Sequence, residues 1–593
     1  MSLDSFDYVV VGGGTAGLVV AARLVEDPAI RVCILEAGVD ITNELDAKVP
    51  GYGMKNLGQP KVDWGFVGSP QVNAEGRSLH LPRQLCRGKS LGGSSMVSLY
   101  THRNCIALES LGSPGWNWEG LVPYFKASET FAPSEEEKAR FKVEFNPSVH
   151  GTSGPLQRTL PKWVSDVTDP FFEAIISVGV PQNPDSFSGS NAGVWLTNQS
   201  IDSNAERSSS ASAYYEPIKT NSNLSVLTGA QATRIIFTSS RDSSGNLVAS
   251  GVEYSKGGRL YAVSAAKEVL LCAGSFKTPQ LLELSAGIGD KNVLNAHGIG
   301  VNTDLPAVGS NLPELDSQLL LQDHFWIPLI METDSKYESL EVLGDPARAA
   351  EEWKLYEESK TGILSAACSA LYAFLPKDHF IADTSAVLSQ ATRSLRPSLD
   401  KLNKAWLDGN DIPFLEIAHF PGFLPMSERI PEAGRSYCSI FLALTHPFSS
   451  GTVHLASADP LAQPAIDHNI LDNGVDMAIL VRAIKFARKL AATSSLNTVI
   501  TEEVVPGPAV QTDAEIEDFV RSVIDTVFHP IGTAAMLPRS DGGVVDSSLK
   551  VYGTSNLRVI DASIIPIQLS AHPQGTVYAI AEKVILSVQI IRS

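Results

Sequence analysis

The pattern of hydrophobic and polar positions near the N-terminus changes from the period of a strand to that of a helix and back. An apolar run of strand type, Asp7 to Val11, leads directly into the glycine turn Gly12 to Gly17. Leu18 to Leu24 then place apolar side chains at helical spacing, and a second apolar strand, Arg31 to Leu35, ends at Glu36. This order of elements predicts a dinucleotide-binding βαβ unit.

Each glycine of the turn has a physical task in such a unit. Gly12 makes the tight turn, Gly14 lets the backbone approach a pyrophosphate, and Gly17 lets the helix pack closely on the strand. The helix N-terminus presents unpaired N–H groups and a partial positive charge to the phosphates. Glu36 lies where an acidic side chain accepts hydrogen bonds from a ribose. A plain glycine-rich turn is the competing interpretation, and the two strands, helix and acid in register weigh against it.

A second glycine-rich segment, Arg87 to Val97, lies within residues Pro82 to Tyr100. Small residues at this density let a backbone pass close to a flat ligand, and successive N–H groups can point at it. A surface loop is the alternative interpretation of this segment.

The middle of the chain is rich in β-branched residues. Short alternating runs between Leu224 and Val263 predict antiparallel strands that return to the first domain. Glu268 to Ala273 is predicted as a buried strand that ends at Gly274, and Ser275 to Ser285 as a helix with Pro279 near its start.

Residues from about 320 to 525 have a different character. They contain the helical stretch Pro346 to Lys360, aromatic-rich strands at Phe414 to Phe420 and Tyr437 to Leu444, and an amphipathic helix from Val475 to Leu490. This part has no glycine-rich phosphate turn and is predicted to be the substrate half.

The C-terminal tail returns to the character of the dinucleotide domain, with a strand at Leu557 to Ala562 and a helix at Pro573 to Ser587. The predicted fold is therefore α/β in its dinucleotide-binding unit and α+β overall. It combines a Rossmann-like domain with a second, substrate-binding domain built on an antiparallel sheet with helices.

Composition and charge narrow the possible partners. The 593 residues predict several domains, and the net charge of −19 argues against nucleic acid or an anionic membrane as partner, because both need a basic face. The six cysteines are scattered without CxxC pairs, so neither a metal site nor thiol redox chemistry is expected.

Targeting signals are not evident in the sequence. The N-terminal residues run directly into the first strand without a basic and apolar leader, and no apolar run reaches the length of a membrane span. The last residues are not a Ser-Lys-Leu type of peroxisomal address. We therefore expect an intracellular, cytoplasmic protein that is a monomer or a homodimer.

One nucleotide site without a second GxGxxG predicts a resident cofactor, for which FAD is the common choice. Gly287 to Asn292 fails the pattern at its last position, so no separate nicotinamide domain is expected. A flavin that oxidises an alcohol needs a base for the hydroxyl proton, and neutral imidazole suits this task. His529 and His572 are candidates, and each precedes a proline that favours a turn. A histidine with a purely structural role in a turn is the alternative for each.

The whole chain resembles the glucose-methanol-choline (GMC) oxidoreductase family, and the ordered set of motifs is specific although no single piece is. In family order, the matching pieces are Gly12–Gly17 with Glu36–Gly38, Gly88–Ser95, Trp116–Glu129, Gly274–Leu282, Val308–Leu312, His446-Pro447 with Gly451–Leu455, Asp459-Pro460, Pro464–Asp467, His529–Met536, and Asp561-Ala562 through Glu582-Lys583.

The resemblance implies an FAD site and a catalytic pair. By this similarity His529 matches the family's catalytic base, and His572 its partner. The cofactor-binding positions that the resemblance and the βαβ unit predict together are Gly12, Gly14, Thr15, Ala16, Gly17, Glu36, Ala37, Arg87, Gly88, Gly92, Gly93, Ser94, Ser95, Ala232, Ala273, Gly274, Asp561, Ala562, Pro573 and Gln574.

The same resemblance leads us to expect that the two domains are interleaved along the chain. We predict that the FAD-binding domain comprises residues 1–165, 205–318 and 526–593, and that the substrate domain comprises residues 166–204 and 319–525.

The chain departs from the family pattern at three places. Ser98 stands where relatives usually have asparagine or histidine, so neither a covalent histidyl-flavin bond nor the usual side-chain contact carries over. Leu99 stands where aryl-alcohol oxidases tend to have tyrosine, although Tyr100 is adjacent. Residues Pro313 to Leu321 interrupt a normally continuous motif, and Ala286 adds a residue before Gly287. We expect the longer insertion to form a surface excursion, or alternatively part of a lid.

These features together predict a flavin alcohol oxidase or dehydrogenase. The expected substrate is a primary alcohol, with aryl and allylic alcohols as candidates, and O2 or another acceptor reoxidises the flavin. A histidine pair is typical of the aryl-alcohol oxidase branch, whereas formate oxidases carry arginine at the position of His572, so formate is disfavoured. A non-redox lyase or cyclase of the same family, similar to a hydroxynitrile lyase with structural FAD, is the alternative. A light-driven decarboxylase finds no supporting arginine or apolar stretch.

Overall fold

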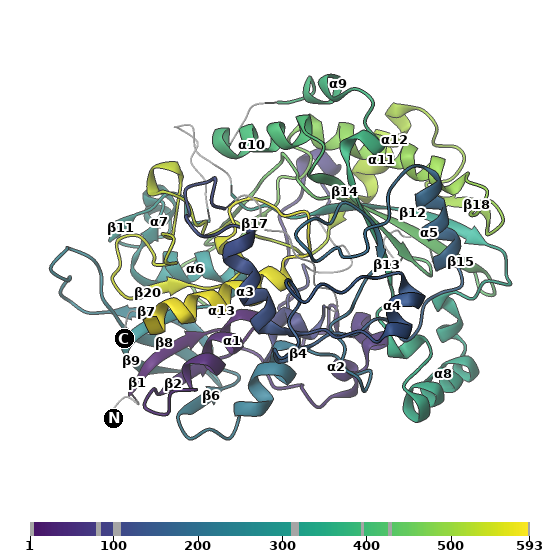
Figure 1. The fold of residues 1–593 in the computed structure, drawn as a ribbon. Helices are drawn as coiled ribbons and strands as arrows, with labels where there is room; N and C mark the ends of the chain where they lie inside the picture. The colour runs from purple at the N-terminus through teal and green to yellow at the C-terminus, as the bar shows by residue number, and fades with distance from the viewer. Residues whose placement is uncertain are drawn as a thin grey trace.

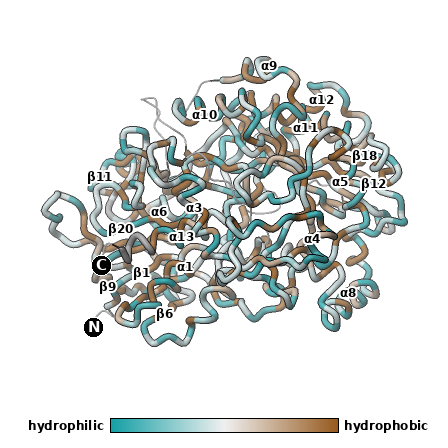
Figure 2. The backbone as a smooth tube through the Cα atoms, in the orientation of Figure 1, coloured by the Kyte–Doolittle hydropathy of each residue, from teal (hydrophilic) through white to brown (hydrophobic). Residues whose placement is uncertain are grey.

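The computed structural model describes residues 5–78, 85–98, 108–309, 320–392, 396–424 and 430–590. Its two largest sheets are shown in Figure 1, one near the two termini and one on the far side of the molecule. Each sheet has its own hydrophobic core. In Figure 2, hydrophobic residues run along the strands, whereas many residues of the outer loops are hydrophilic.

The first sheet is built on the predicted N-terminal unit. Its strands are β6 (Leu224–Leu227), β2 (Val32–Leu35), β1 (Ser5–Val11), β9 (Arg259–Leu271), β20 (Leu557–Val559), β8 (Ala249–Lys256) and β7 (Gln231–Phe237). The strands β6, β2, β1, β9 and β20 are parallel, and β9, β8 and β7 continue the sheet as an antiparallel ribbon. The interior strand β1 is almost entirely buried, as its apolar sequence predicts for a parallel sheet covered on both faces.

The structure corrects two expectations for this sheet. β6 was expected to be antiparallel but pairs parallel with β2, with Leu224 opposite Val32. The two strands expected before and after Ser264 form the single long strand β9, whose first part pairs with β8 and whose second part pairs with β1 and β20. No glycine or proline interrupts the run from Leu260 to Leu271, and the change of neighbour is absorbed by a register shift opposite Phe6.

Helices from distant parts of the chain cover the first sheet. Helix α13 (Gln574–Ile590) packs between α1 (Thr15–Leu24) and α3 (Trp118–Ser128), and α6 (Gly274–Ala286) packs against β7. These positions agree with the helices predicted at Leu18 to Leu24, Ser275 to Ser285 and Pro573 to Ser587. The C-terminal tail thereby returns to the N-terminal unit, as its sequence pattern predicts.

The second sheet is antiparallel throughout. Its strands are β18 (Ile500–Val505), β12 (Phe325–Thr333), β15 (Ser436–Leu444), β14 (Pro413–Phe420), β13 (Leu371–Pro376), β5 (Gly193–Leu196) and β19 (Asp525–Thr526). Strand β19 pairs with β12. Strand β5 lies in the sequence between β2 and β6, two strands of the first sheet, but it pairs with β13 of the second.

Helix α11 (Gly474–Ala491) packs on this sheet at β15 and β12. Its start is fixed by Asn473, whose side chain accepts a hydrogen bond from Val475 N. The other helices are α2 (Leu45–Lys48), α4 (Glu135–Phe141), α5 (Thr168–Ser177), α7 (Lys291–Ala296), α8 (Pro346–Ser359), α9 (Thr384–Leu388), α10 (Pro397–Asp408) and α12 (Asp513–Val523).

Candidate active site

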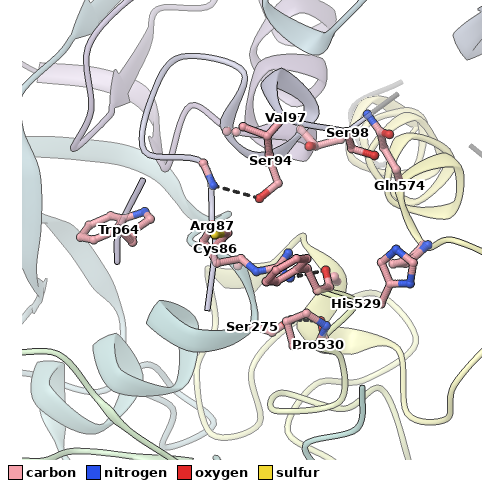
Figure 3. Close-up of a pocket in the computed structure, with 18 of the residues that line it drawn as sticks. Trp64, Cys86, Arg87, Ser94, Val97, Ser98, Ser275, His529, Pro530 and Gln574 are labelled. Atoms are coloured by element: carbon pink, nitrogen blue, oxygen red, sulfur yellow. Dashed lines mark hydrogen bonds between the residues drawn. The ribbon is translucent and has the colours of Figure 1, made fainter. Parts of the chain in front are cut away.

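A large cavity of about 480 Å³ runs from the glycine turn after β1 to the strands of the second sheet. The N-terminal turn, the second glycine-rich segment and the start of α13 line one side of it. Strands β12, β13, β14 and β15 contribute side chains to the other side. Figure 3 shows part of this lining, with Arg87 and Ser94 from the glycine-rich segment and His529 and Gln574 from the C-terminal tail.

The glycine turn is required by the close approach of three backbone segments. Gly12 has φ +102°, and a Cβ there would lie 2.4 Å from the carbonyl oxygen of Cys272, at the end of β9. A Cβ on Gly17 would lie 1.9 Å from the carbonyl oxygen of Gly12. Only glycine at both positions lets α1 begin directly against the strand ends and present its N-terminus to the cavity.

Glu36 ends β2 beside this turn. Its carboxylate accepts hydrogen bonds from Gly13 N at 2.8 Å and from Gly38 N at 2.7 Å. The side chain is buried, and burial raises its pKa to about 7 despite these two donors. Glu36 therefore holds the loops on both sides of it and lines the cavity at the turn.

The second glycine-rich segment crosses the first at contact distance. Gly93 has φ +50°, and a Cβ there would lie 2.8 Å from the Cα of Gly14. Gly92 N donates to the carbonyl oxygen of Gly13 at 2.8 Å, and Gly88 N donates to Ser94 Oγ at 3.3 Å, as marked in Figure 3. The crossing forms a narrow backbone wall that a flat or elongated ligand can approach closely.

Two residues of the C-terminal tail complete this side. Asp561 follows β20 and accepts hydrogen bonds from Gly274 N at 2.9 Å and from Thr278 Oγ1 at 2.7 Å, which ties the tail to the start of α6. Gln574 begins α13 and lines the cavity. Both polar atoms of its side-chain amide are buried and have no hydrogen-bond partner of normal geometry among the described residues. Together with the helix N-terminus, this amide is available to a polar ligand.

The structure brings most of the predicted cofactor positions to the cavity. Gly12, Gly14, Thr15, Ala16, Glu36, Ala37, Arg87, Gly88, Gly93, Ser94, Ala232, Ala273, Gly274, Asp561, Ala562, Pro573 and Gln574 line it. Gly17, Gly92 and Ser95 lie behind the lining. Ser95 is fully buried and donates to the carbonyl oxygen of Gly92 at 2.6 Å, with Ser210 Oγ 3.0 Å away.

The two candidate histidines lie side by side in the cavity wall. The ring centroids of His529 and His572 are 4.7 Å apart, and their planes are tilted by 45°. The backbone of His529 is fixed on both sides, because its N–H donates to Asp323 Oδ1 at 2.7 Å and its carbonyl accepts from Gln568 Nε2 at 2.8 Å. The preceding Phe528 has φ +64°, and its carbonyl oxygen accepts a hydrogen bond from Arg87. A phenylalanine in this backbone region is strained, which is consistent with a loop held in place for function.

Two further ionisable residues lie next to this pair and were not identified from the sequence. Glu416 lies in the middle of β14 with no exposed surface, and its Oε1 is 2.9 Å from His572 Nε2. His324 precedes β12, and its Nδ1 is 2.9 Å from His529 Nδ1. The available signal for Glu416 was a single carboxylate in a mostly apolar strand, which also contains His419. For His324 it was a pair of polar residues, Asp323 and His324, directly before a buried strand.

Aromatic side chains line the cavity on the side of the second sheet. Trp326 and Phe441 stack with centroids 4.6 Å apart, and Tyr372 meets His572 edge to face at 5.6 Å. Glu416 is the only charged residue among the described parts of strands β12 to β15 that line the cavity. This wall therefore suits a flat, uncharged group.

One of the three departures from the family pattern lies at the cavity. Ser98 lines the cavity, whereas Leu99, Tyr100 and residues 313–319 of the expected insertion lie outside the described residues. Over the described part of the chain, no group of three or more metal-ligating side chains is present. None of the described helices is both long and apolar enough to span a membrane.

The chain is similar to known proteins over most of its length. The GMC oxidoreductase family matches residues 6–314 with its N-terminal part and residues 447–581 with its C-terminal part. The chain is 37% identical to the GMC oxidoreductase family protein Mala s 12 of Malassezia sympodialis, over 98% of this chain and 91% of that protein. It is 36% identical to the dehydrogenase citC of Monascus ruber, over 98% of this chain and 95% of that protein.

Solved structures show the same similarity over the full length. An FAD-dependent oxidoreductase from Chaetomium thermophilum superposes with a TM-score of 0.87 at 27% identity, covering 99% of this chain and 100% of that one. A fungal aryl-alcohol oxidase superposes with a TM-score of 0.84 at 26% identity, covering 100% of both chains.

Proposed function

Because the chain belongs to the GMC oxidoreductase family, which binds FAD, we propose that it oxidises a primary alcohol to an aldehyde with histidine as the base. His529 takes the hydroxyl proton in this proposal, and His572 binds the same hydroxyl group. The observation that carries the proposal is the pair of imidazole rings, 4.7 Å apart, in the wall of the cavity.

The residues on the first-sheet side of the cavity fit FAD. The crossing of Gly14 and Gly93 leaves no room for side chains and gives a dinucleotide access to the backbone. Glu36 supplies the acidic group for a ribose, and the N-terminus of α13 with the buried amide of Gln574 supplies donors for a polar ring. When bound, FAD supplies the acceptor for a hydride at flavin N5. We assign its binding to the predicted cofactor positions that line the cavity.

The substrate proposal follows from the opposite wall. Tyr372 offers flat apolar surface against His572, and Trp326 and Phe441 line the same cavity. Glu416 disfavours an anionic substrate near His572, and the described strands β12 to β15 supply no arginine or lysine to this wall. We therefore propose an uncharged primary alcohol whose hydroxymethyl group is attached to an aryl or allylic system, and we disfavour formate.

The electron acceptor belongs to the same proposal. O2, reduced to H2O2, and another acceptor are both compatible with the site, and the similar proteins include one named as a dehydrogenase and one named as an aryl-alcohol oxidase. Measuring H2O2 release and the reduction of an added acceptor in parallel distinguishes the two.

The experiment is a screen of purified protein against primary, secondary, aryl and allylic alcohols, following peroxide release and reduction of a dye in parallel. We expect turnover with aryl or allylic primary alcohols. If a substrate is consumed while the flavin stays oxidised without an acceptor, the protein is a lyase or cyclase with structural FAD, and the proposal is wrong.

A further inference from the structure

A third histidine, His324, lies directly behind the candidate base and is fully buried. It does not line the cavity, so it cannot touch a substrate there. Its ring meets the ring of His529 edge to face, at 84° with centroids 5.1 Å apart. The two Nδ1 atoms are 2.9 Å apart, which is the distance of a hydrogen bond. One of these two nitrogens must therefore donate a proton and the other must accept it.

The second nitrogen of His324 decides which of the two donates. His324 Nε2 lies 2.9 Å from the backbone carbonyl oxygen of Leu569. A carbonyl oxygen can only accept a hydrogen bond, so His324 Nε2 carries a hydrogen. The ring can carry a second hydrogen on Nδ1 only if it is positively charged.

The surroundings of His324 keep its ring neutral. Burial lowers its pKa to about 4, and the proximity of Glu416 and Asp323 raises the value too little to offset burial. The other titratable groups near this ring are His572, which lowers the pKa further, His529 and His446. At neutral pH His324 therefore has one hydrogen, on Nε2, and a lone pair on Nδ1.

This arrangement fixes the hydrogen of the candidate base. His529 must donate from Nδ1 to His324 Nδ1, so the lone pair of a neutral His529 ring is on Nε2. We propose that His324 is a positioning residue that holds His529 in the tautomer and ring orientation in which Nε2 is the proton acceptor. This inference rests on the proposed function only in calling that acceptor a catalytic base.

The proton transfer balances without moving a charge to His324. In alcohol oxidation the substrate O–H bond breaks and an N–H bond forms at His529 Nε2, while the hydride leaves the carbinol carbon for the flavin. His529 becomes an imidazolium that still donates from Nδ1 to His324. Neutral His324 therefore accepts the hydrogen bond from His529 both before and after the transfer. The carboxylate of a catalytic triad does the same for its histidine, but it carries a full negative charge.

Two substitutions of His324 separate its role as hydrogen-bond acceptor for His529 from its role as donor to Leu569. In asparagine, Oδ1 branches from Cγ as imidazole Nδ1 does, so His324→Asn keeps an acceptor for His529 but loses the bond to Leu569. The glutamine amide reaches the position of Nε2 instead, so His324→Gln keeps a donor for Leu569 and loses the acceptor. Both remove the imidazole, and their loss of packing is therefore similar.

We expect the rate constant of anaerobic flavin reduction to fall about 10²-fold in His324→Gln, and less than about 5-fold in His324→Asn, with similar substrate Kd in both. Equal rates in the two variants, or a slower His324→Asn, would overturn the proposal. Thermal unfolding of both variants measures the packing loss separately.

A second measurement needs neither substitution at His324 nor a substrate. Nitrogen-15 NMR of protein labelled at histidine distinguishes protonated from unprotonated ring nitrogens, and His529→Ala identifies the signals of His529. In the wild-type protein we expect the His529 hydrogen on Nδ1 and the lone pair on Nε2. A His529 ring protonated on Nε2 in its neutral form contradicts the inference. Failure of every alcohol to reduce the flavin would instead refute the proposed function and leave this tautomer result standing.

Discussion

Glu416 Oε1 lies 2.9 Å from His572 Nε2, and the carboxylate is fully buried in the middle of strand β14. Its second oxygen has no hydrogen-bond partner among the described residues. A carboxylate in such a site depends on the imidazole for its stability, and it holds the hydrogen of His572 on Nε2. Glu416 therefore fixes the ring of His572 from the second sheet, while His572 itself begins the return of the chain to the first sheet.

Replacing Glu416 by glutamine tests this contact. Glu416→Gln removes a charge-assisted hydrogen bond, so we expect anaerobic flavin reduction to slow about 10-fold or more. Glu283 supplies a matched control, because it is also fully buried and its Oε1 lies 2.6 Å from His454 Nδ1, away from the cavity lining. Glu283→Gln is expected to lower the unfolding temperature and leave flavin reduction in the folded protein unchanged. Equal effects of both substitutions on flavin reduction would assign Glu416 a structural role only.

His529 is expected to be needed for reduction of the flavin and not for its binding. His529→Ala removes the general base, and we expect the rate constant of flavin reduction to fall at least about 10²-fold. The FAD content of the purified variant, measured from its absorbance, should match that of the wild type. His297, at the end of α7 and away from the cavity lining, is the control, and His297→Ala should reduce flavin at the wild-type rate. Reduction of His529→Ala at a rate near that of the wild type would remove the assignment.

The crossing of the glycine segments predicts a selective loss of cofactor. A Cβ on Gly93 would lie 2.8 Å from the Cα of Gly14, whereas a Cβ on Gly257 would meet nothing within 4 Å. Both glycines have positive φ, +50° and +58°, so Gly93→Ala and Gly257→Ala share the backbone strain. We expect Gly93→Ala to be purified with far less FAD and Gly257→Ala with the wild-type amount. Full FAD content in Gly93→Ala would show that the crossing does not hold the cofactor.

The raised pKa of Glu36 predicts how the stability of the apoprotein depends on pH. Burial raises its pKa from 4.5 in the unfolded chain to about 7 in the folded one. The folded state then binds more protons than the unfolded state between these values, so stability falls as pH rises through this range. Between pH 5 and pH 8 the free energy of unfolding of wild-type apoprotein should fall by about 2 kcal/mol relative to Glu36→Gln. Urea unfolding at several pH values measures the difference, and parallel curves for the two proteins would contradict the pKa shift.

The sequence predicted those parts of the protein whose signal is local. The order of strand, glycine turn and helix around Gly12 identifies the N-terminal unit, because the three elements follow one another directly in the sequence. Strands β14 and β15 and helix α11 follow from their hydrophobic period. Strand direction is not a local property, and for this reason β6 was expected with the wrong direction.

The chemistry around the histidine pair depends on contacts between residues far apart in the chain. His529 and His572 were identified from the sequence because the tail carries both, and the resemblance to a known family assigns them roles. Glu416 lies in a strand of the second sheet and His324 directly precedes another, and only folding brings them to the two rings. A carboxylate in an apolar strand can serve packing as well as catalysis, so its sequence signal alone cannot reveal its partner.

Anaerobic reduction of the bound flavin by an aryl primary alcohol and by its α-dideuterated form is the most direct test of the account. We predict that the alcohol bleaches the flavin of the wild-type protein and that the deuterated alcohol does so more slowly, because hydride leaves the carbinol carbon. A flavin that stays oxidised with every primary alcohol tested, or bleaching at the same rate with both forms when reduction is the observed step, would contradict it.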